Sequence, residues 1–258
     1  MTANNYDAIV VGGGHNGHVA AAYLARAGLR TVVCESRPVV GGAAVTEQPF
    51  GPDYHVTSLS YVVSLLPPSL VRDLSLERYG YHVYPQGDIG DGNTGVWGFP
   101  RGGMGGVTSA MEAAARSFGV EIRTSSPVEE ITTHGGVATG VVLASGDQLS
   151  APTVVTTAHP AISFLRLVDR AALPADFVAD IERWKSRSGV VKVNLAVDRL
   201  PEFSAKPGFD PEVHGGTIVL AESLGDLEQS FQDAVGGRAS GQPFASTRQG
   251  RAPTAAAA

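Results

Sequence analysis

The sequence predicts an α/β fold built around a parallel sheet that binds a dinucleotide, and three consecutive features of residues 6–42 predict it. An apolar, β-branched run at residues 8–11 is typical of a strand that is buried on both faces. The motif G-x-G-x-x-G follows at Gly12, Gly14 and Gly17 and opens a helix rich in alanine. A second apolar run then ends in an acid, Glu35. In this order, the features predict a Rossmann-like domain.

Each glycine of the motif has its own structural task. Gly12 allows a tight turn, Gly14 lets a pyrophosphate approach the backbone, and Gly17 lets the helix pack closely on the strand. The predicted helix over residues 16–27 directs its free N–H groups, and the positive end of its dipole, toward the turn. We therefore expect a diphosphate at this helix N-terminus.

The predicted second strand covers residues 31–34 and places Glu35 at its end, 23 residues after Gly12. A carboxylate at this position accepts hydrogen bonds from ribose hydroxyls, and it would repel a 2′-phosphate. These features alone leave two cofactors open, because NAD and the ADP half of FAD are bound by the same arrangement.

Composition indicates a globular protein of the reducing cytoplasm. Of 258 residues, 43% are apolar, and the net charge of −6 argues against non-specific binding to nucleic acid or to an acidic membrane surface. The one cysteine, Cys34, excludes an intrachain disulfide and is expected in the core. The N-terminus does not have the pattern of a signal peptide, and no apolar run reaches the about 18 residues of a transmembrane segment.

The residues after Glu35 suggest a second contact with the cofactor. Arg37 is placed to neutralise charge near the ribose and the diphosphate, and the pair Gly41-Gly42 lets another loop come close. A simple turn between two strands is the equally weighted alternative.

The segment ESRPVVGGAAVTE, following VVGGGHNGHVAAAYLARAG, resembles the FAD-dependent oxidoreductases of the phytoene-desaturase and amine-oxidase type, and among them the phytoene-dehydrogenase-like group. The resemblance implies FAD rather than NAD. It also implies that Val128 contacts the adenine side through its backbone. The remaining cofactor-binding residues implied by the resemblance are Gly12, Gly13, Gly14, Asn16, Gly17, Glu35, Ser36, Arg37, Gly41, Gly42 and Ala43.

The rest of the chain predicts a small β-meander and part of another domain. Alternating or β-branched runs separated by turn residues lie between residues 120 and 157. We expect an FAD-binding domain at residues 5–168 and the remnant of a substrate domain at residues 169–235, with an alternating strand at 190–197. Residues 245–258 lack periodicity and predict a disordered tail.

Two family segments are missing from the sequence. Relatives in this group carry a long insertion where this chain passes from VYPQG to DIGDG, so we expect an internal deletion near residues 86–88. A C-terminal glycine-rich motif that covers the flavin ring region is also missing. The resemblance therefore implies a chain that is better equipped to hold the ADP half of FAD than to enclose the reactive ring.

No serine–histidine–acid set, metal-ligand cluster or paired-carboxylate motif stands out, so the sequence indicates neither a catalytic residue nor a metal site. Flavin enzymes do not require one, because the flavin itself carries the hydride. The leading hypothesis, from the resemblance, is an FAD-dependent oxidoreductase that desaturates an apolar small molecule, with FAD binding without turnover for this shortened chain.

Two other functions stay open. One is a non-catalytic module that binds a lipid or a partner on the same fold, and the other is an NAD-dependent dehydrogenase. Peripheral contact with a membrane is compatible with the sequence, and the oligomeric state is not indicated.

Overall fold

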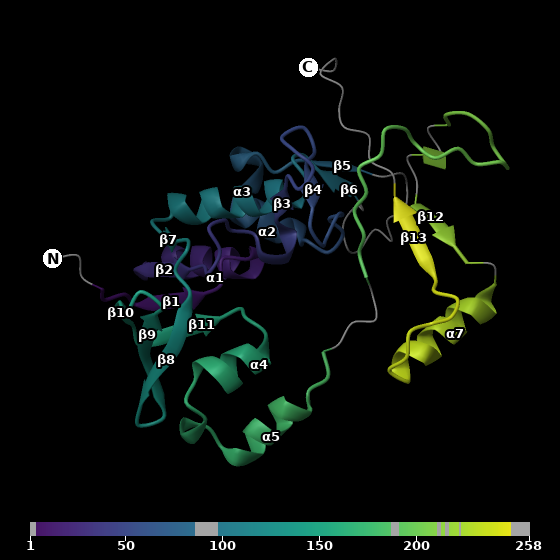
Figure 1. The fold of residues 1–258 in the computed structure, drawn as a ribbon. Coiled ribbons are helices and arrows are strands. Elements are labelled where there is room, and N and C mark those ends of the chain that lie inside the picture. Colours follow the sequence, from purple (N-terminus) through teal and green to yellow (C-terminus); the bar gives the residue numbers. More distant parts are fainter. Residues whose placement is uncertain are drawn as a thin grey trace. The chain divides into compact units, whose positions relative to one another are not determined.

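The computed structural model describes residues 4–85, 98–186, 191–210, 213–214, 217–221 and 223–248. The chain forms two compact units, of which the first comprises Met1–Pro49 and His55–Ser186 and the second Phe50–Tyr54 and Arg187–Ala258. The units are described separately below (Figure 1). The internal deletion that the sequence predicts near residues 86–88 lies outside the described residues.

The first unit is built on a sheet of four parallel strands in the order β11-β1-β2-β7. The predicted strands at residues 8–11 and 31–34 are confirmed as β1 and β2. The strands are β1 (Ala8–Val11), β2 (Thr31–Cys34), β7 (Glu121–Arg123) and β11 (Thr153–Thr156).

Both faces of this sheet are covered, which is why its two central strands, β1 and β2, are buried at every position. Val10 and Val33 lie in one core cluster with residues of the helices α1 (His15–Arg26) and α3 (Met104–Ser117). Ile9 and Val32 belong to a second cluster, shared with an antiparallel sheet in the order β10-β9-β8. Figure 1 shows the helices on one side of the parallel sheet and this sheet on the other. The α/β fold and the small β-meander are thus confirmed.

The remaining elements of the first unit are short. Ser75 has a φ of 50° and separates the helix α2 from the 3-10 helix η2. The strands β3 and β4 pair with each other, as do β5 and β6. The bounds are β8 (Val128–His134), β9 (Val137–Leu143), β10 (Gln148–Ser150), η1 (Gly42–Ala44), β3 (Thr46–Glu47), β4 (Val56–Thr57), α2 (Pro68–Asp73), η2 (Leu76–Tyr79), β5 (Val83–Pro85), β6 (Gly98–Pro100), α4 (Pro160–Ile162), the π-helical η3 (Ser163–Leu167), η4 (Arg170–Ala172) and α5 (Ala175–Arg183).

The first unit extends to Ser186. The helix α5 belongs to it because Phe177 packs edge-on against Phe164, with the ring centroids 5.0 Å apart. An ion pair between Arg170 and Glu182, at 2.6 Å, adds a second link between α5 and the preceding turn. These contacts between side chains close in sequence carry the unit to Ser186.

The second unit departs from the sequence prediction at two places. The predicted strand at residues 190–197 is wrong for its described part, since residues 191–197 form no strand and Val191 and Leu195 are 84% and 78% exposed. The predicted disorder from residue 245 is wrong for Ala245–Arg248, which form β13 and pair with β12 (Thr217–Leu220). Residues 249–258 lie outside the described part. The helix α7 (Leu224–Val235) starts with a capping box formed by Ser223 and Asp226.

None of the described helices combines the length with the apolar character that a membrane crossing requires.

Candidate cofactor site

The candidate site lies where the parallel strands end. Gly12 follows β1, Glu35 follows β2 and Thr157 follows β11, so all three lie at the carboxyl edge of the sheet. In open α/β sheets, ligands bind in the crevice outside this edge.

The glycines of the first loop differ in what packs against them. A methyl group on Gly17 would lie 1.9 Å from the carbonyl oxygen of Gly12, so only glycine lets α1 begin this close to β1. Gly12 itself has a φ of 105°, which disfavours any larger residue. At Gly14, a methyl group would meet only the Cα atom of Gly42, at 3.8 Å. The protein's own packing therefore does not require a glycine at position 14, and the space beside it is free for a ligand.

The N-terminus of α1 is suited to an anion. Its N-cap is Gly14, which provides no capping side chain, and its first turn contains no acidic residue. The first N–H groups of a helix have no partner within the helix, and the dipole adds positive potential there. His15 and Asn16, the first residues of this helix, are exposed. A diphosphate would satisfy these N–H groups without competition from a side chain.

The second glycine pair lies beside the first loop. The N–H group of Gly41 donates to the carbonyl oxygen of Gly13 at 2.8 Å. A methyl group on Gly42 would approach the Cα atom of Gly14 to 3.2 Å, and both Gly41 and Gly42 have positive φ angles. The pair thus does more than turn the chain, because it forms a second wall next to the helix N-terminus. Ala43 continues this wall in η1 and is exposed.

Glu35 holds the first loop against β2. Its side chain is 6% exposed, and one carboxylate oxygen accepts the N–H group of Gly13 at 2.7 Å. The other oxygen accepts the N–H group of Arg37 at 2.8 Å and the hydroxyl of Ser36 at 3.2 Å. A carboxylate offers about four acceptor positions, so one stays available for a ribose hydroxyl.

The side chain of Arg37 pairs with an acid of the strand β3. Its guanidinium group forms an ion pair with Glu47, which also accepts a hydrogen bond from the Ser58 hydroxyl. These contacts, first the Ser58 hydrogen bond and then the Arg37 pair, lower the pKa of Glu47. Arg37 contributes to the site through its backbone N–H group, which binds Glu35.

Val128 lies two residues after Ser126, whose segment pairs with the residues that follow β2. The N–H group of Ser126 donates to the Glu35 carbonyl oxygen at 2.8 Å, and that of Ser125 donates to the Arg37 carbonyl oxygen at 2.9 Å. This pairing brings the start of β8, at Val128, near the carboxylate that would bind the ribose.

Sequence reasoning missed Thr157. Its hydroxyl donates to the carbonyl oxygens of Val11 and Gly12, at 3.1 and 3.3 Å, and it occupies the space that a methyl group on Gly12 would need. Thr157 follows β11 as Glu35 follows β2, but only the folded sheet places β11 beside β1, so no spacing in the sequence pointed to it.

Residues 10–71 match the family described as NAD(P)-binding Rossmann-like domain, and residues 75–240 match the family described as flavin containing amine oxidoreductase. The chain is similar to pyridine nucleotide-disulfide oxidoreductase domain-containing protein 2 of Rattus norvegicus, with 25% identity over 400 residues, 93% of this chain and 69% of the relative. It is also similar to the zeta-carotene-forming phytoene desaturase of Myxococcus xanthus, with 35% identity over 92 residues, 36% of this chain and 17% of the relative.

Among solved structures, a protein from Pyrococcus furiosus has a similar fold, with a TM-score of 0.59 and 15% identity. The similarity covers 69% of this chain and 65% of that protein.

Proposed function

We propose that this chain, which belongs to the family of flavin containing amine oxidoreductases, holds the ADP half of FAD at the carboxyl edge of its parallel sheet. The chain is an oxidoreductase by family, and FAD is its cofactor. The proposal is the assignment of the binding residues, namely the glycines and Asn16 at the start of α1, the loop at Gly41, Gly42 and Ala43, the segment Glu35–Arg37, and Val128.

One observation carries this assignment. The space beside Gly14 is open although the glycines around it are tightly packed, and it adjoins a helix N-terminus without a capping side chain. A doubly charged diphosphate fits there, since its oxygens accept hydrogen bonds from the free N–H groups of α1. The remaining acceptor position on Glu35 then fits a ribose hydroxyl.

FAD, when bound, supplies a ring that accepts a hydride. The described residues would bind and orient the other end of the cofactor. Glu35 fixes the first glycine loop and Thr157 closes the space behind Gly12, so the loop is held in shape before the ligand arrives. Such preorganisation reduces the ordering that binding requires.

We propose an apolar small molecule as the substrate and its desaturation as the reaction. Support comes from the similarity to a zeta-carotene-forming phytoene desaturase, of which this chain covers 17%. Peripheral contact with a membrane would suit such a substrate.

We also propose that this chain binds FAD without turning over substrate. The alignment with the rat relative extends over 400 positions, while the chain has 258 residues, so at least 400 − 258 = 142 positions have no residue in this chain. These positions support an internal deletion, which we place near residues 86–88 on the basis of the sequence. A substrate domain shortened in this way would provide less of the enclosure that excludes water from a flavin.

The visible spectrum of the purified protein tests the binding proposal. We expect added FAD to be retained through gel filtration and to show a protein-bound flavin spectrum. Gly14→Val should abolish retention, because its side chain fills the space meant for the diphosphate. Gly241→Val is the matched control, since Gly241 has open space around it and no left-handed φ angle.

Two outcomes would contradict the proposal in different ways. A colourless protein that does not retain FAD would overturn FAD binding by this chain. Retention by Gly14→Val equal to that of the unchanged protein would place the diphosphate elsewhere. Retained FAD with no bleaching under any apolar electron donor would support binding without turnover, whereas bleaching would overturn that part.

A further inference from the structure

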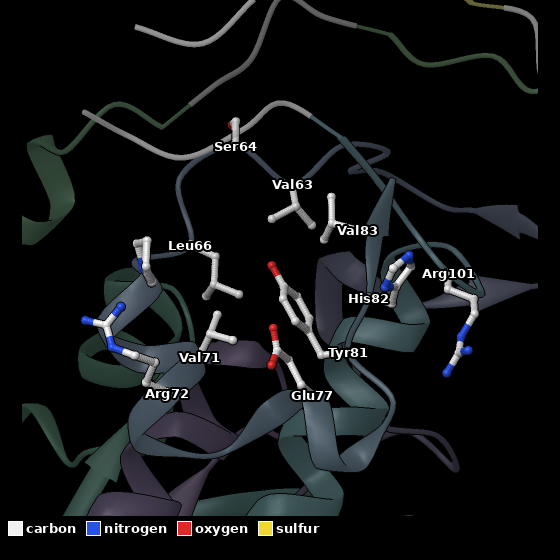
Figure 2. A pocket seen from close by; sticks show the side chains of 11 residues that line it. Val63, Ser64, Leu66, Val71, Arg72, Glu77, Tyr81, His82, Val83 and Arg101 are labelled. Atoms are coloured by element: carbon white, nitrogen blue, oxygen red, sulfur yellow. The ribbon is translucent and has the colours of Figure 1, made fainter. Parts of the chain in front are cut away.

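A pocket of about 720 Å³ lies in the first unit between α2, η2 and β5 (Figure 2). None of its lining residues belongs to the candidate cofactor site. Its volume falls in the range of roughly 300–1,000 Å³ that is usual for small-molecule sites.

The walls of the pocket are largely apolar. Val63, Leu66 and Val71 line one part of it, and Val83 lines another. All four are at least partly buried in the same core cluster, so the walls are backed by packed side chains. A hydrocarbon group placed there would be removed from water on several sides, which favours its binding.

Two polar groups point into the middle of the pocket. Figure 2 shows the hydroxyl of Tyr81 and the carboxylate of Glu77 on the same side of its interior. Within the described part of the chain, neither group has a hydrogen-bond or ion-pair partner. Burial, and then the charge of Glu77, raise the pKa of the Tyr81 phenol, which therefore stays protonated.

The cationic side chains of the pocket lie at its rim. Figure 2 shows the guanidinium groups of Arg72 and Arg101 directed away from Tyr81 and Glu77. That of Arg101 donates to the carbonyl oxygen of Gly80 at 3.4 Å. Glu77 is exposed to solvent, and its negative charge has no ion-pair partner among the residues that the structure describes.

We propose that this pocket binds a small organic cation with an apolar body, with the cationic head between the Glu77 carboxylate and the Tyr81 hydroxyl. The head would contact two polar groups that have no hydrogen-bond or ion-pair partner within the described part of the chain, and the body would cover the apolar walls. Both features are needed, because an inorganic cation would leave the walls in contact with water. The inference concerns binding alone and does not depend on FAD.

Titration calorimetry of the purified protein with three probes of equal chain length tests the inference. We expect hexylammonium to bind, 1-hexanol to bind at least roughly tenfold more weakly, and hexanoate not to bind, because hydrogen bonds between charged groups are stronger than those between neutral groups. Equal binding of 1-hexanol and hexylammonium would overturn the role of the charge. Preferred binding of hexanoate, or no binding of any probe, would overturn the proposal.

Variants locate the site. Glu77→Gln keeps the shape of an exposed side chain and should weaken hexylammonium binding roughly tenfold. Glu129→Gln, an exposed position on β8 outside the pocket, removes the same charge and should leave binding unchanged. Tyr81→Phe should weaken binding by a smaller factor, since one hydrogen bond is lost. If Glu77→Gln and Glu129→Gln bind alike, the cation is held elsewhere and the proposal fails.

Discussion

A methyl group at Gly17 would lie 1.9 Å from the carbonyl oxygen of Gly12, well inside contact distance. The clash involves two backbone segments at the centre of the fold, so no flexible side chain can move to relieve it. We expect Gly17→Ala to lower the free energy of unfolding by about 3 kcal/mol or more. Urea unfolding followed by circular dichroism measures this. Gly241→Ala, at a position with open space, should change stability by less than about 0.5 kcal/mol. Equal stability of the two variants would show that α1 starts farther from β1.

His18 is a residue whose environment the sequence did not reveal. It lies one turn into α1, is fully buried, and has no hydrogen-bond partner for either ring nitrogen among the described residues. Burial lowers its pKa, and the charge of Arg116 adds to this, although the charges of Glu112 and Glu35 and the nearby backbone of Gly13, which lies outside good hydrogen-bond geometry, partly oppose it. The folded protein therefore keeps this imidazole neutral.

The sign of the resulting pH dependence follows from linkage. The unfolded chain takes up a proton on His18 at about pH 6.5, whereas the folded chain does so only at a lower pH. The free energy of unfolding should thus fall as the pH drops below about 6.5, until the folded pKa is reached. His18→Leu should remove this decrease and raise stability at neutral pH by about 1–3 kcal/mol, because an unsatisfied buried polar group is removed.

Urea unfolding at several pH values between about 4.5 and 8 checks the prediction. The same change at the exposed His134 is the control and should leave the slope in place. A slope that persists unchanged in His18→Leu would assign the pH dependence to another group.

At the scale of elements, two threonine side chains replace the missing cap of α3. The N-cap of α3 is Gly103, which has no side chain. The Met104 N–H group instead donates to the Thr57 hydroxyl at 3.3 Å, and the Gly105 N–H group to the Thr46 hydroxyl at 2.9 Å. Strands β3 and β4 thus provide hydrogen-bond acceptors for the first N–H groups of α3, although this helix starts far from them in the sequence.

Thr46→Val retains the shape of the side chain and removes its hydrogen bonds to Gly105 and Gly102. We expect a loss of roughly 1–2 kcal/mol in the free energy of unfolding. Thr133→Val, on β8, makes the same change where no side-chain hydrogen bond exists among the described residues and should cost less than about 0.5 kcal/mol. If the Thr46→Val protein is as stable as the control, water accepts the hydrogen bond of the Gly105 N–H group equally well.

The elements that the sequence predicted well are those fixed by local chemistry. The strands β1 and β2 are buried on both faces, so all of their residues except Thr31 are apolar, and Gly17 between them is required by its contact with the backbone of Gly12. The residues 191–197 alternate as a strand does, yet no neighbouring strand pairs with them in the described structure. Alternating apolar residues indicate that one face of an extended segment could be buried, but a strand forms only where another segment of the chain pairs with it.

In the candidate site, too, local features were predicted from the sequence and contacts between distant segments were not. The motif and the strand ends pointed to Gly12, Gly14, Gly17 and Glu35, because their spacing is set by one β–α–β unit. The pairing of Arg37 with Glu47 and the placement of Thr157 depend on segments that meet only in the folded chain. Sequence spacing alone does not provide that information.

At the scale of the whole molecule, the two units differ in how firmly their elements are held. The first contains both core clusters that surround the parallel sheet. In the second, α7 has no buried residue, and Leu224, Phe231 and Val235 on this helix are 84%, 60% and 69% exposed. A helix with so little buried apolar surface opens at low free energy.

FAD should therefore stabilise the two units unequally, and amide hydrogen exchange measured by mass spectrometry can resolve this. A ligand at 100 times its Kd stabilises the state that binds it by about 2.7 kcal/mol. Because all proposed contacts lie in the first unit, exchange should slow in peptides from β1, α1 and β2, and stay rapid and unchanged in peptides from α7. Gly14→Val, measured with the same FAD, should show no slowing in either unit. Protection of α7 by FAD in the unchanged protein would contradict the assignment, because it would require the cofactor or its binding energy to reach the second unit.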